Sequence, residues 1–398
     1  MNALKKILFV IILVTLATWI GWPPPALSAG AVKIGFMAPY VGVYAKLGMD
    51  MDKGFKMYMD EVGWKGGGRK IVMIKSDTEA KPSLGPTKAK ELVEKDKVDL
   101  IAGIVHSGVA MSIRDYVTEK KIPVVITNAG APELTSTRKS PYIFRVSFAN
   151  GQQDLAGGWY AYNKEGYKKM VLFAADYSAG HDKANGFMKY FKGSGGIVLK
   201  EIYPPLSTQD FGPYLLDARK LAKEINATWG FESGSDSIRF VTQYAEFGLK
   251  QMAPLFCVGD TIDDAFIPSM GDAALGAKTY THYCISIDNP QNKKFVADYR
   301  KKYKEDPSMF SEAGYIGAKA IVETLNGIHG KVEDKDAFLS TMRKVSFAAP
   351  RGPFKYDANQ NVIENVYITK VQKVGNKLLN VVKDVVPNVD QNWTPPKK

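Results

Sequence analysis

The chain has little cysteine and little histidine for its length. Its 398 residues include only 2 cysteines and 4 histidines. Cys257 and Cys284 each lie near the end of a predicted strand, and two alternatives stay open for them, one disulfide or two separate buried thiols. The histidines share no metal-ligand spacing with one another or with a cysteine, so no metal site is expected. They are His106, His181, His282 and His329.

Sequence motifs of nucleotide binding and of acyl transfer are also missing. The chain has no Gly-x-Ser-x-Gly elbow, no phosphate-binding loop and no strand-linked Gly-x-Gly-x-x-Gly. Gly66-Gly67-Gly68 lacks the spacing of a phosphate loop and predicts a turn. We therefore expect a protein that is not an enzyme and that uses no cofactor, with an exported hydrolase as the least favoured alternative.

Clusters of basic residues are absent, although the formal net charge is +12. Lys and Arg alternate with Asp and Glu along the predicted helices instead of gathering with aromatic residues on one stretch. This pattern is typical of a solvated surface. No nucleic-acid partner is therefore expected.

A long hydrophobic run occurs only near the N-terminus, from Ile7 to Ile20, between Lys5-Lys6 and a proline block. The run is shorter than the roughly 18 residues of a membrane-spanning helix. It predicts a secretory signal peptide over residues 1–29, with an uncleaved anchor as the alternative. Cleavage after Ser28 or Ala29 would release the chain into the periplasm.

The rest of the chain exceeds the usual size of one hydrophobic core, which favours two domains. From Val32 to Val146, nearly continuous apolar strands alternate with helical patterns, and the same alternation runs from Asn150 to Tyr283. This is typical of parallel sheets that helices cover on both faces. Two doubly wound α/β lobes are predicted. The last strands, Val366–Val371 and Leu378–Val385, alternate in polarity and favour an antiparallel edge.

One segment, Asp99–Thr135, places two turns of small residues after neighbouring parallel strands. Ligands bind at this edge of an open α/β sheet. In the first turn, Ser107 has the position expected of a helix N-cap, and the free N–H groups and helix dipole there favour a carboxylate. The segment predicts a site for a small anion, with simple helix capping as the alternative role of Ser107.

Six short segments, taken in order, resemble a known family. They are Val32–Tyr40, Ala129–Thr135, Asp176–Gly180, Gly271–Gly276, Asp288–Pro290 and Arg351–Phe354. Their order and spacing over the whole mature chain resemble the leucine/branched-chain-type periplasmic substrate-binding proteins of ABC importers. The resemblance implies a type I periplasmic binding fold, in which two lobes close on a ligand like a Venus flytrap. Three crossings between the lobes are implied near Val146–Asn150, Tyr283–Ile287 and Lys355–Gln360.

The resemblance also implies domain boundaries and a function. Lobe 1 would contain residues 30–148 and 286–356, and lobe 2 residues 149–285 and 357–390, with a tail at 391–398. The expected function is that of a monomeric solute-binding subunit that passes a small carboxylate to an inner-membrane ABC permease. The solute would be a branched-chain or hydrophobic amino acid or an aromatic carboxylate. A receptor that signals to a kinase or chemoreceptor is the alternative.

In lobe 1, the resemblance implies that the ligand carboxylate is held by the Ser107 hydroxyl and by N–H groups of the turn after the next strand. That turn contributes Asn128, Ala129, Gly130 and Ala131. His106 and Tyr40 are expected to flank the cleft.

In lobe 2, the implied contacts are Tyr177, Ala179, Ser233, Gly234 and Asp260. Ala179 stands where the family has an aromatic residue, which predicts a wider pocket and a ligand larger than leucine. Gly259 or Asp260 aligns with the acidic residue that holds an amino acid's ammonium group. Because an unpaired buried ammonium is costly, a displaced acid makes a ligand without that group credible.

Overall fold

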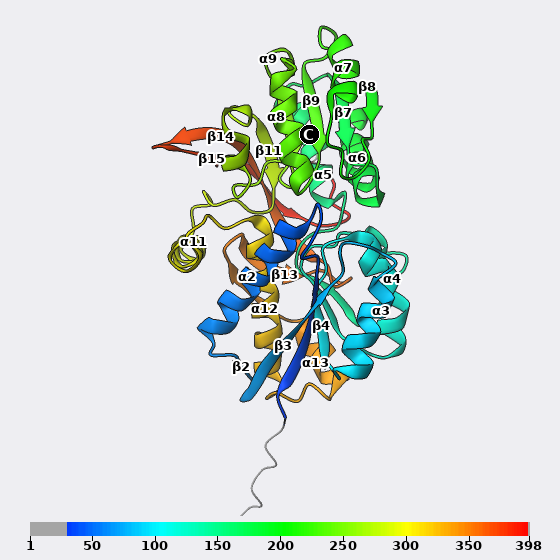
Figure 1. Ribbon diagram of the computed structural model, residues 1–398, viewed down its shortest axis with the longest axis vertical. Coiled ribbons are helices and arrows are strands. Elements are labelled where there is room, and N and C mark those ends of the chain that lie inside the picture. The colour runs from blue at the N-terminus through cyan, green and yellow to red at the C-terminus, as the bar shows by residue number, and fades with distance from the viewer. Residues whose placement is uncertain (1–29, 397–398) are drawn as a thin grey trace, which may run out of the picture. The chain divides into compact units, whose positions relative to one another are not determined.

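The computed structural model describes residues 30–396. The predicted signal peptide over residues 1–29 lies outside them, as do residues 397 and 398 of the predicted tail. From Val32 onwards the chain forms one compact unit, and its strands form two sheets (Figure 1). In the described part, no helix has both the length and the apolar character that crossing a membrane requires.

The first sheet has six strands in the order β2-β3-β1-β4-β5-β6. All neighbours from β3 to β6 are parallel, and β2 pairs antiparallel with β3. β4, β5 and β6 are buried along their whole length, as expected of parallel strands covered on both faces. The strands are β1 (Val32–Ala38), β2 (Lys65–Gly66), β3 (Arg69–Asp77), β4 (Leu100–Gly103), β5 (Val124–Ile126) and β6 (Ile143–Arg145).

Helices from both ends of the chain cover this first sheet. α12 returns to it from late in the sequence and packs along α2. A Cβ atom at Gly54 of α2 would lie 1.7 Å from the carbonyl oxygen of Ser311, so only glycine allows the two backbones to approach so closely. The helical segments are α2 (Ala45–Glu61), α3 (Gly85–Lys90), η1 (Glu91–Lys95), α4 (Ser107–Glu119), η2 (Pro132–Thr135), α12 (Met309–Gly327) and α13 (Lys335–Met342).

The second sheet has nine strands, in the order β12-β13-β14-β11-β10-β9-β7-β8, with β15 paired to β14. Its centre, from β8 to β11, is parallel. β14 joins β11 and β15 antiparallel, in agreement with the pattern of the last predicted strands. The strands are β7 (Lys169–Ala174), β8 (Ile197–Ile202), β9 (Ala227–Phe231), β10 (Leu255–Val258), β11 (Lys278–Thr281), β12 (Ser346–Ala349), β13 (Gly352–Tyr356), β14 (Val362–Val374) and β15 (Lys377–Val389).

Of the remaining helical segments, α5 lies between β6 and β7, and the others follow strands of the second sheet. They are α5 (Gln152–Asn163), α6 (Ser178–Gly193), α7 (Gly212–Lys220), α8 (Ser235–Glu246), α9 (Leu249–Met252), α10 (Ile267–Met270), η3 (Gly271–Ala273) and α11 (Pro290–Tyr303). The chain passes from the first sheet to the second between β6 and β7. The predicted lobe boundary at residue 356 stays a prediction, because β13 pairs with the first residues of β14 whereas later residues of β14 pair with β11.

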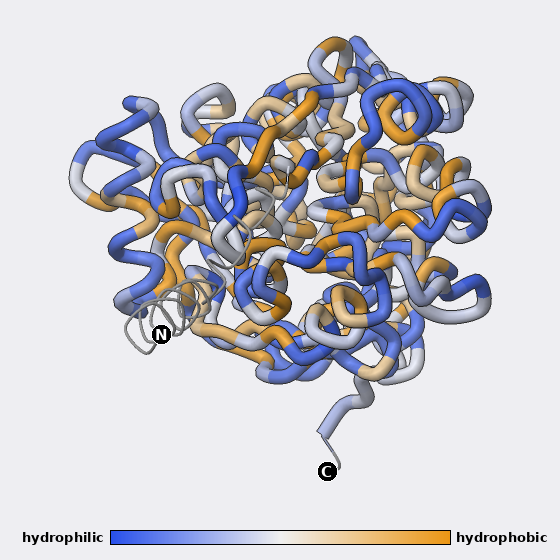
Figure 2. Tube along the Cα trace, turned by 90° about the horizontal axis from the view of Figure 1, so that it is seen from below, coloured by the Kyte–Doolittle hydropathy of each residue, from blue (hydrophilic) through white to orange (hydrophobic). Residues whose placement is uncertain are grey.

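The hydrophobic residues lie mainly on the strands and on the inner faces of the helices, with hydrophilic residues on the outer turns (Figure 2). Cys257 and Cys284 are both buried in this interior and are free thiols. Of the two alternatives for the cysteines, the structure therefore has the separate thiols.

Candidate functional site

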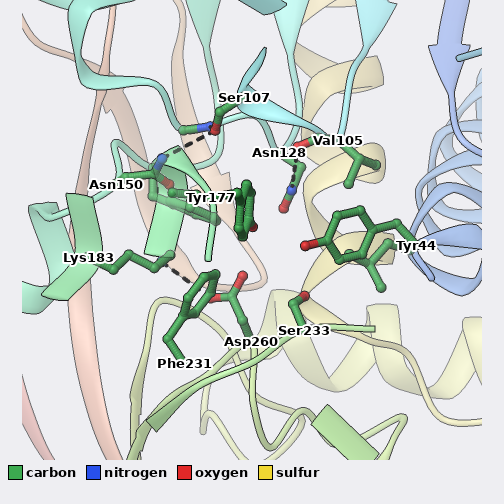
Figure 3. A pocket seen from close by; sticks show the side chains of 14 residues that line it. Tyr44, Val105, Ser107, Asn128, Asn150, Tyr177, Lys183, Phe231, Ser233 and Asp260 are labelled. Carbon is green, nitrogen blue, oxygen red and sulfur yellow. Dashed lines mark hydrogen bonds and ion pairs between the residues drawn. The ribbon is translucent and has the colours of Figure 1, made fainter. Parts of the chain in front are cut away.

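A small cavity lies where the carboxyl ends of strands from both sheets come together (Figure 3). Its volume is about 20 Å³, enough for about one water molecule. Its walls come from the residues that end or follow β1, β4, β5 and β6 in the first sheet and β7, β9 and β10 in the second. The lining residues are Tyr44, Leu47, Val105, Ser107, Asn128, Gly130, Phe148, Asn150, Tyr177, Ala179, Lys183, Phe231, Ser233 and Asp260.

Most of the residues that the sequence predicts for the site line this cavity. They are Ser107, Asn128, Gly130, Tyr177, Ala179, Ser233 and Asp260. The other predicted residues do not line it, namely His106, Ala129, Ala131, Tyr40 and Gly234. The structure thus brings both predicted halves of the site to one place and gives several members different roles.

The helix cap is His106, not Ser107, which corrects the sequence prediction. The Nδ1 atom of His106 accepts a hydrogen bond from the backbone N–H of Gly108, 3.0 Å away, and Ser107 is the first residue of α4. Ser107 Oγ accepts hydrogen bonds from Gly130 N at 3.3 Å and from Asn150 Nδ2 at 3.2 Å. Since these bonds use both of its lone pairs, the hydroxyl hydrogen remains to be donated into the cavity.

The ring of His106 lies against residues that line the cavity. Its centroid is 5.3 Å from that of Tyr177, which follows β7 of the second sheet, and 6.3 Å from that of Tyr44. Burial lowers the pKa of His106 to about 4, so the imidazole is neutral at neutral pH. His106 therefore caps α4 and packs across the two sheets, without bringing a positive charge to the site.

The amide roles predicted for the turn after β5 fit only in part. Ala129 is wrongly assigned, because its N–H is already donated to the carbonyl of Ile104 at 2.9 Å. The carbonyl of Ala131 accepts from Arg145 Nη1 at 2.7 Å. Gly130 and Asn128 are the members of the turn that line the cavity, and the N–H of Gly130 is donated to Ser107 Oγ at 3.3 Å.

Tyr40 lies apart from the cavity lining, beside Lys75, whose Nζ is 5.1 Å from the centroid of the tyrosine ring. Its backbone N–H is donated to Asp77 Oδ1 at 3.1 Å. In this conformation Tyr40 therefore belongs to the end of the first sheet and not to the ligand cavity.

Gly234 holds the two sides of the site together without lining the cavity. Its φ of +66° and a Cβ position 2.2 Å from the Val43 carbonyl oxygen both exclude a side chain. The next residue, Ser235, donates its N–H to the same oxygen at 3.2 Å. In the segment that joins the two sheets, Asn150 Nδ2 also donates a hydrogen bond to Asp182 Oδ2 at 3.2 Å.

Four aromatic side chains form much of the wall. Tyr44, Phe148, Tyr177 and Phe231 all line the cavity. The Tyr177 ring stacks on Phe231 with centroids 6.2 Å apart and planes at 27°, and it lies 6.3 Å from Tyr44. Such a wall suits a flat apolar body. Of the four, only Tyr177 was predicted from the sequence, since the others resemble ordinary core aromatics.

The cavity is also lined by a buried ion pair, of which the acid, Asp260, was predicted from the sequence and the base, Lys183, was not. Lys183 lies one turn after Ala179 on α6, and both line the cavity. Lys183 Nζ is 3.4 Å from Asp260 Oδ2, and the two side chains are 1% and 5% exposed. The predicted widening at Ala179 is not present in this conformation, where Lys183 forms part of the wall. The sequence did contain one indication of Lys183: it follows Ala179 by four residues, which places the two on the same face of the helix.

Lys183 is also enclosed by aromatic rings. Its Nζ lies 4.4 Å from the centroid of Phe148 and 5.2 Å from that of Phe231, within the range of cation–π attraction. These contacts hold the ammonium group at one end of the cavity, away from Ser107 (Figure 3).

A buried polar cluster lies next to this wall. His282 packs on Phe148 with centroids 5.4 Å apart, and its Nδ1 is 2.8 Å from Gln153 Nε2. Nearby, Glu364 lies 3.8 Å from Arg351 Nη1, and burial raises its pKa to about 8. Between residues 30 and 396 no group of His, Cys, Asp or Glu is arranged to hold a metal ion.

Comparison with known proteins identifies similar sequences and folds. The model of the periplasmic binding protein family matches residues 31–376. The Leu/Ile/Val-binding protein homolog 6 of Brucella melitensis is 31% identical over 356 residues, which are 87% of this chain and 89% of that protein.

Two solved structures of ABC-transporter solute-binding proteins are also similar. One, from R. palustris in complex with benzoate, is 33% identical with a TM-score of 0.85 and covers 92% of this chain and 100% of its own. The other, from Rhodopseudomonas palustris BisB5 in complex with 3,4-dihydroxybenzoic acid, is 33% identical with a TM-score of 0.86 and covers 91% and 99%.

Proposed function

Because the chain belongs to the periplasmic binding protein family, we propose that it binds an aromatic carboxylate in this cavity and delivers it to the permease of an ABC importer. Membership confirms the type I periplasmic binding fold predicted from the sequence. Members of the family are extracytoplasmic binding proteins, so the proposal concerns the recognition and release of a solute.

The observation that carries the proposal is the pairing of Asp260 with Lys183. An amino acid brings a carboxylate and an ammonium group, and the ammonium group needs a buried anion as its partner. Asp260 is the acidic residue at the position predicted for that role, but the Lys183 ammonium already lies 3.4 Å from it. A second ammonium group beside Asp260 would meet the like charge of Lys183, which disfavours an amino acid.

A carboxylate fits the opposite end of the cavity. The Ser107 hydroxyl has a hydrogen to donate, and it stands at the N-terminus of α4, a helix of 13 residues. Hydrogen bonds to a charged acceptor and the positive end of the helix dipole both stabilise an anion there. Asn128 borders the same end, although its Nδ2 donates to the Val105 carbonyl at 3.1 Å.

An aromatic ring fits between the two ends. Tyr177 and Phe231 are stacked, and Tyr44 and Phe148 complete the wall, so the middle of the cavity offers mainly ring faces. Aromatic pairs in such arrangements contribute about 0.5–1.5 kcal/mol beyond the burial of their area. Benzoate is what one similar protein holds in its crystal structure.

Ligand entry requires the two sides of the site to separate, because about 20 Å³ cannot accommodate an aromatic acid. The hydrogen bond between the sides, from the Ser235 N–H to the Val43 carbonyl, is a contact that would break on opening and reform on closure. Binding would then shift the population toward the closed form.

The test is a thermal-shift screen followed by calorimetry on the mature chain, with benzoate, 4-hydroxybenzoate, leucine and phenylalanine. A ligand that binds the folded state raises the unfolding temperature by mass action. We expect aromatic acids to raise it and both amino acids to leave it unchanged. Stabilisation by leucine or phenylalanine together with no effect of any aromatic acid would refute the proposal.

A further inference from the structure

The ion pair at the far end of the cavity has unused hydrogen-bonding capacity. Lys183 Nζ and Asp260 Oδ2 are separated by 3.4 Å, which is longer than the roughly 2.7–2.9 Å of a good charge-assisted hydrogen bond. Among the described residues, neither atom has a hydrogen-bond partner, although both are buried. A buried donor and a buried acceptor left in this way cost free energy, which a suitable partner would recover.

The chemistry of the two atoms selects the kind of partner. The ammonium group only donates hydrogen bonds, and the carboxylate only accepts them. A group placed against both must therefore accept one hydrogen bond and donate another. A hydroxyl group does this, whereas a carboxylate would face Asp260, an ammonium group would face Lys183, and a methyl group would leave both atoms unpaired.

The position of the pair selects where that hydroxyl stands on the ligand. Ser107 and the Lys183–Asp260 pair lie at opposite ends of the same cavity, with the Tyr177 ring between them (Figure 3). A ring whose carboxylate meets Ser107 therefore directs its remote edge, and not the edge beside the carboxylate, toward the pair.

We infer that Lys183 and Asp260 form a specificity subsite for a ring hydroxyl, so that the preferred ligand is an aromatic acid hydroxylated opposite its carboxylate. The hydroxyl donates its hydrogen to Asp260 Oδ2 and accepts one from Lys183 Nζ. The inference rests on the proposed function and goes further by naming the substituent that the ligand carries. Among similar proteins, one holds an unsubstituted benzoate and another a hydroxylated one. Fold similarity alone therefore does not decide between the two ligands.

The main competing occupant of the subsite is water. The cavity has room for about one water molecule, which would bridge the same two atoms. If that water stays when benzoate binds, a ring hydroxyl gains nothing. The two cases therefore differ in a measurable ratio of dissociation constants.

The experiment is calorimetry on the mature protein with benzoate, 4-hydroxybenzoate and 2-hydroxybenzoate. We expect the 4-hydroxy acid to bind about ten- to a hundredfold more tightly than benzoate, as for one or two hydrogen bonds to charged groups. The 2-hydroxy acid is the matched ligand control, because its hydroxyl cannot reach the subsite, and it should gain no such advantage. This comparison needs no variant and so does not depend on any mutant folding.

Variants then test whether the preference for 4-hydroxybenzoate depends on the Lys183–Asp260 pair. In the double variant Lys183→Met, Asp260→Leu, both charges are removed together, so neither is left buried alone. It should still bind benzoate but lose the preference for 4-hydroxybenzoate. Lys189→Met makes the same change at an exposed lysine of α6 and should keep the preference.

The outcomes separate the inference from the proposed function. Equal affinities for benzoate and 4-hydroxybenzoate in the unaltered protein would overturn the subsite while leaving an aromatic-acid receptor intact. An undiminished preference in the double variant would also overturn it. Failure of every aromatic acid to bind would instead refute the proposed function.

Discussion

Replacing Ser107 by alanine is the sharpest test of the carboxylate end of the cavity. The substitution removes the Ser107 hydroxyl hydrogen, which is free to be donated to the ligand because Ser107 Oγ already accepts from Gly130 N and Asn150 Nδ2. A hydrogen bond to a charged group contributes about 1.5–3 kcal/mol. The dissociation constant for an aromatic acid should therefore rise about ten- to a hundredfold.

The same substitution also affects the unliganded protein, and the assay has to separate the two effects. Gly130 N loses its acceptor and Asn150 Nδ2 loses one of its two, so the unfolding temperature of the unliganded variant should fall as well. Calorimetry at a temperature where the variant is fully folded isolates the loss of binding. Ser112→Ala is the matched control, since Ser112 lies on the same helix, bonds only to the Val109 carbonyl, and does not line the cavity. An unchanged dissociation constant in Ser107→Ala would show that the anion is held elsewhere.

Two further predictions concern closure and pH. Gly234→Ala should weaken ligand binding about tenfold or more by calorimetry, because the added Cβ meets a backbone oxygen across the closed site. Gly248→Ala has a similar positive φ but open space around it, so it should change affinity little, and equal effects would argue against closure. In Glu364→Gln, the unfolding temperature should fall less between about pH 5 and pH 8 than in the unaltered protein. The reason is that burial raises the folded-state pKa of Glu364 to about 8, so its contribution to stability is complete below the ordinary value of 4.5 and is lost as pH rises through about 8. Parallel pH profiles of the two proteins would contradict this account.

The parallel centres of both sheets could be predicted because β4, β9 and β10 are buried throughout, and β7 beyond its first residue, so that these strands form nearly continuous apolar runs. The antiparallel strands were harder to predict from the sequence. β12 and β13 are largely exposed on alternate residues and were not predicted, and β14 and β15 extend well beyond the predicted ranges. Their length depends on pairing with distant strands, which a local pattern does not contain.

The site was predictable to the extent that it follows from topology. Turns after parallel strands meet at one edge, which is why Ser107, Gly130, Ser233 and Asp260 line one cavity. The exact cap was not predictable, because the extended backbone of His106, with ψ of 127°, is what shifts the start of α4 by one residue.

Other members of the site depend on how the two sheets are placed together. Phe148 and Phe231 have the sequence character of core residues, and Lys183 lies within a helix that alternates polar and apolar residues. Nothing local distinguishes them. They become part of the site only because the ends of the two sheets face each other across the cavity.

The charges of the lining explain how one architecture can serve different carboxylates. A buried Asp260 requires a cation beside it, and either the ligand or the protein can supply that cation. Here the protein supplies it through Lys183, so the charged side chains that line the cavity balance each other, and His106 adds no charge because its pKa is about 4. A ligand then needs one negative charge at the α4 end and a neutral far end. An aromatic acid meets that requirement, whereas a zwitterion would add a positive charge that the site already contains.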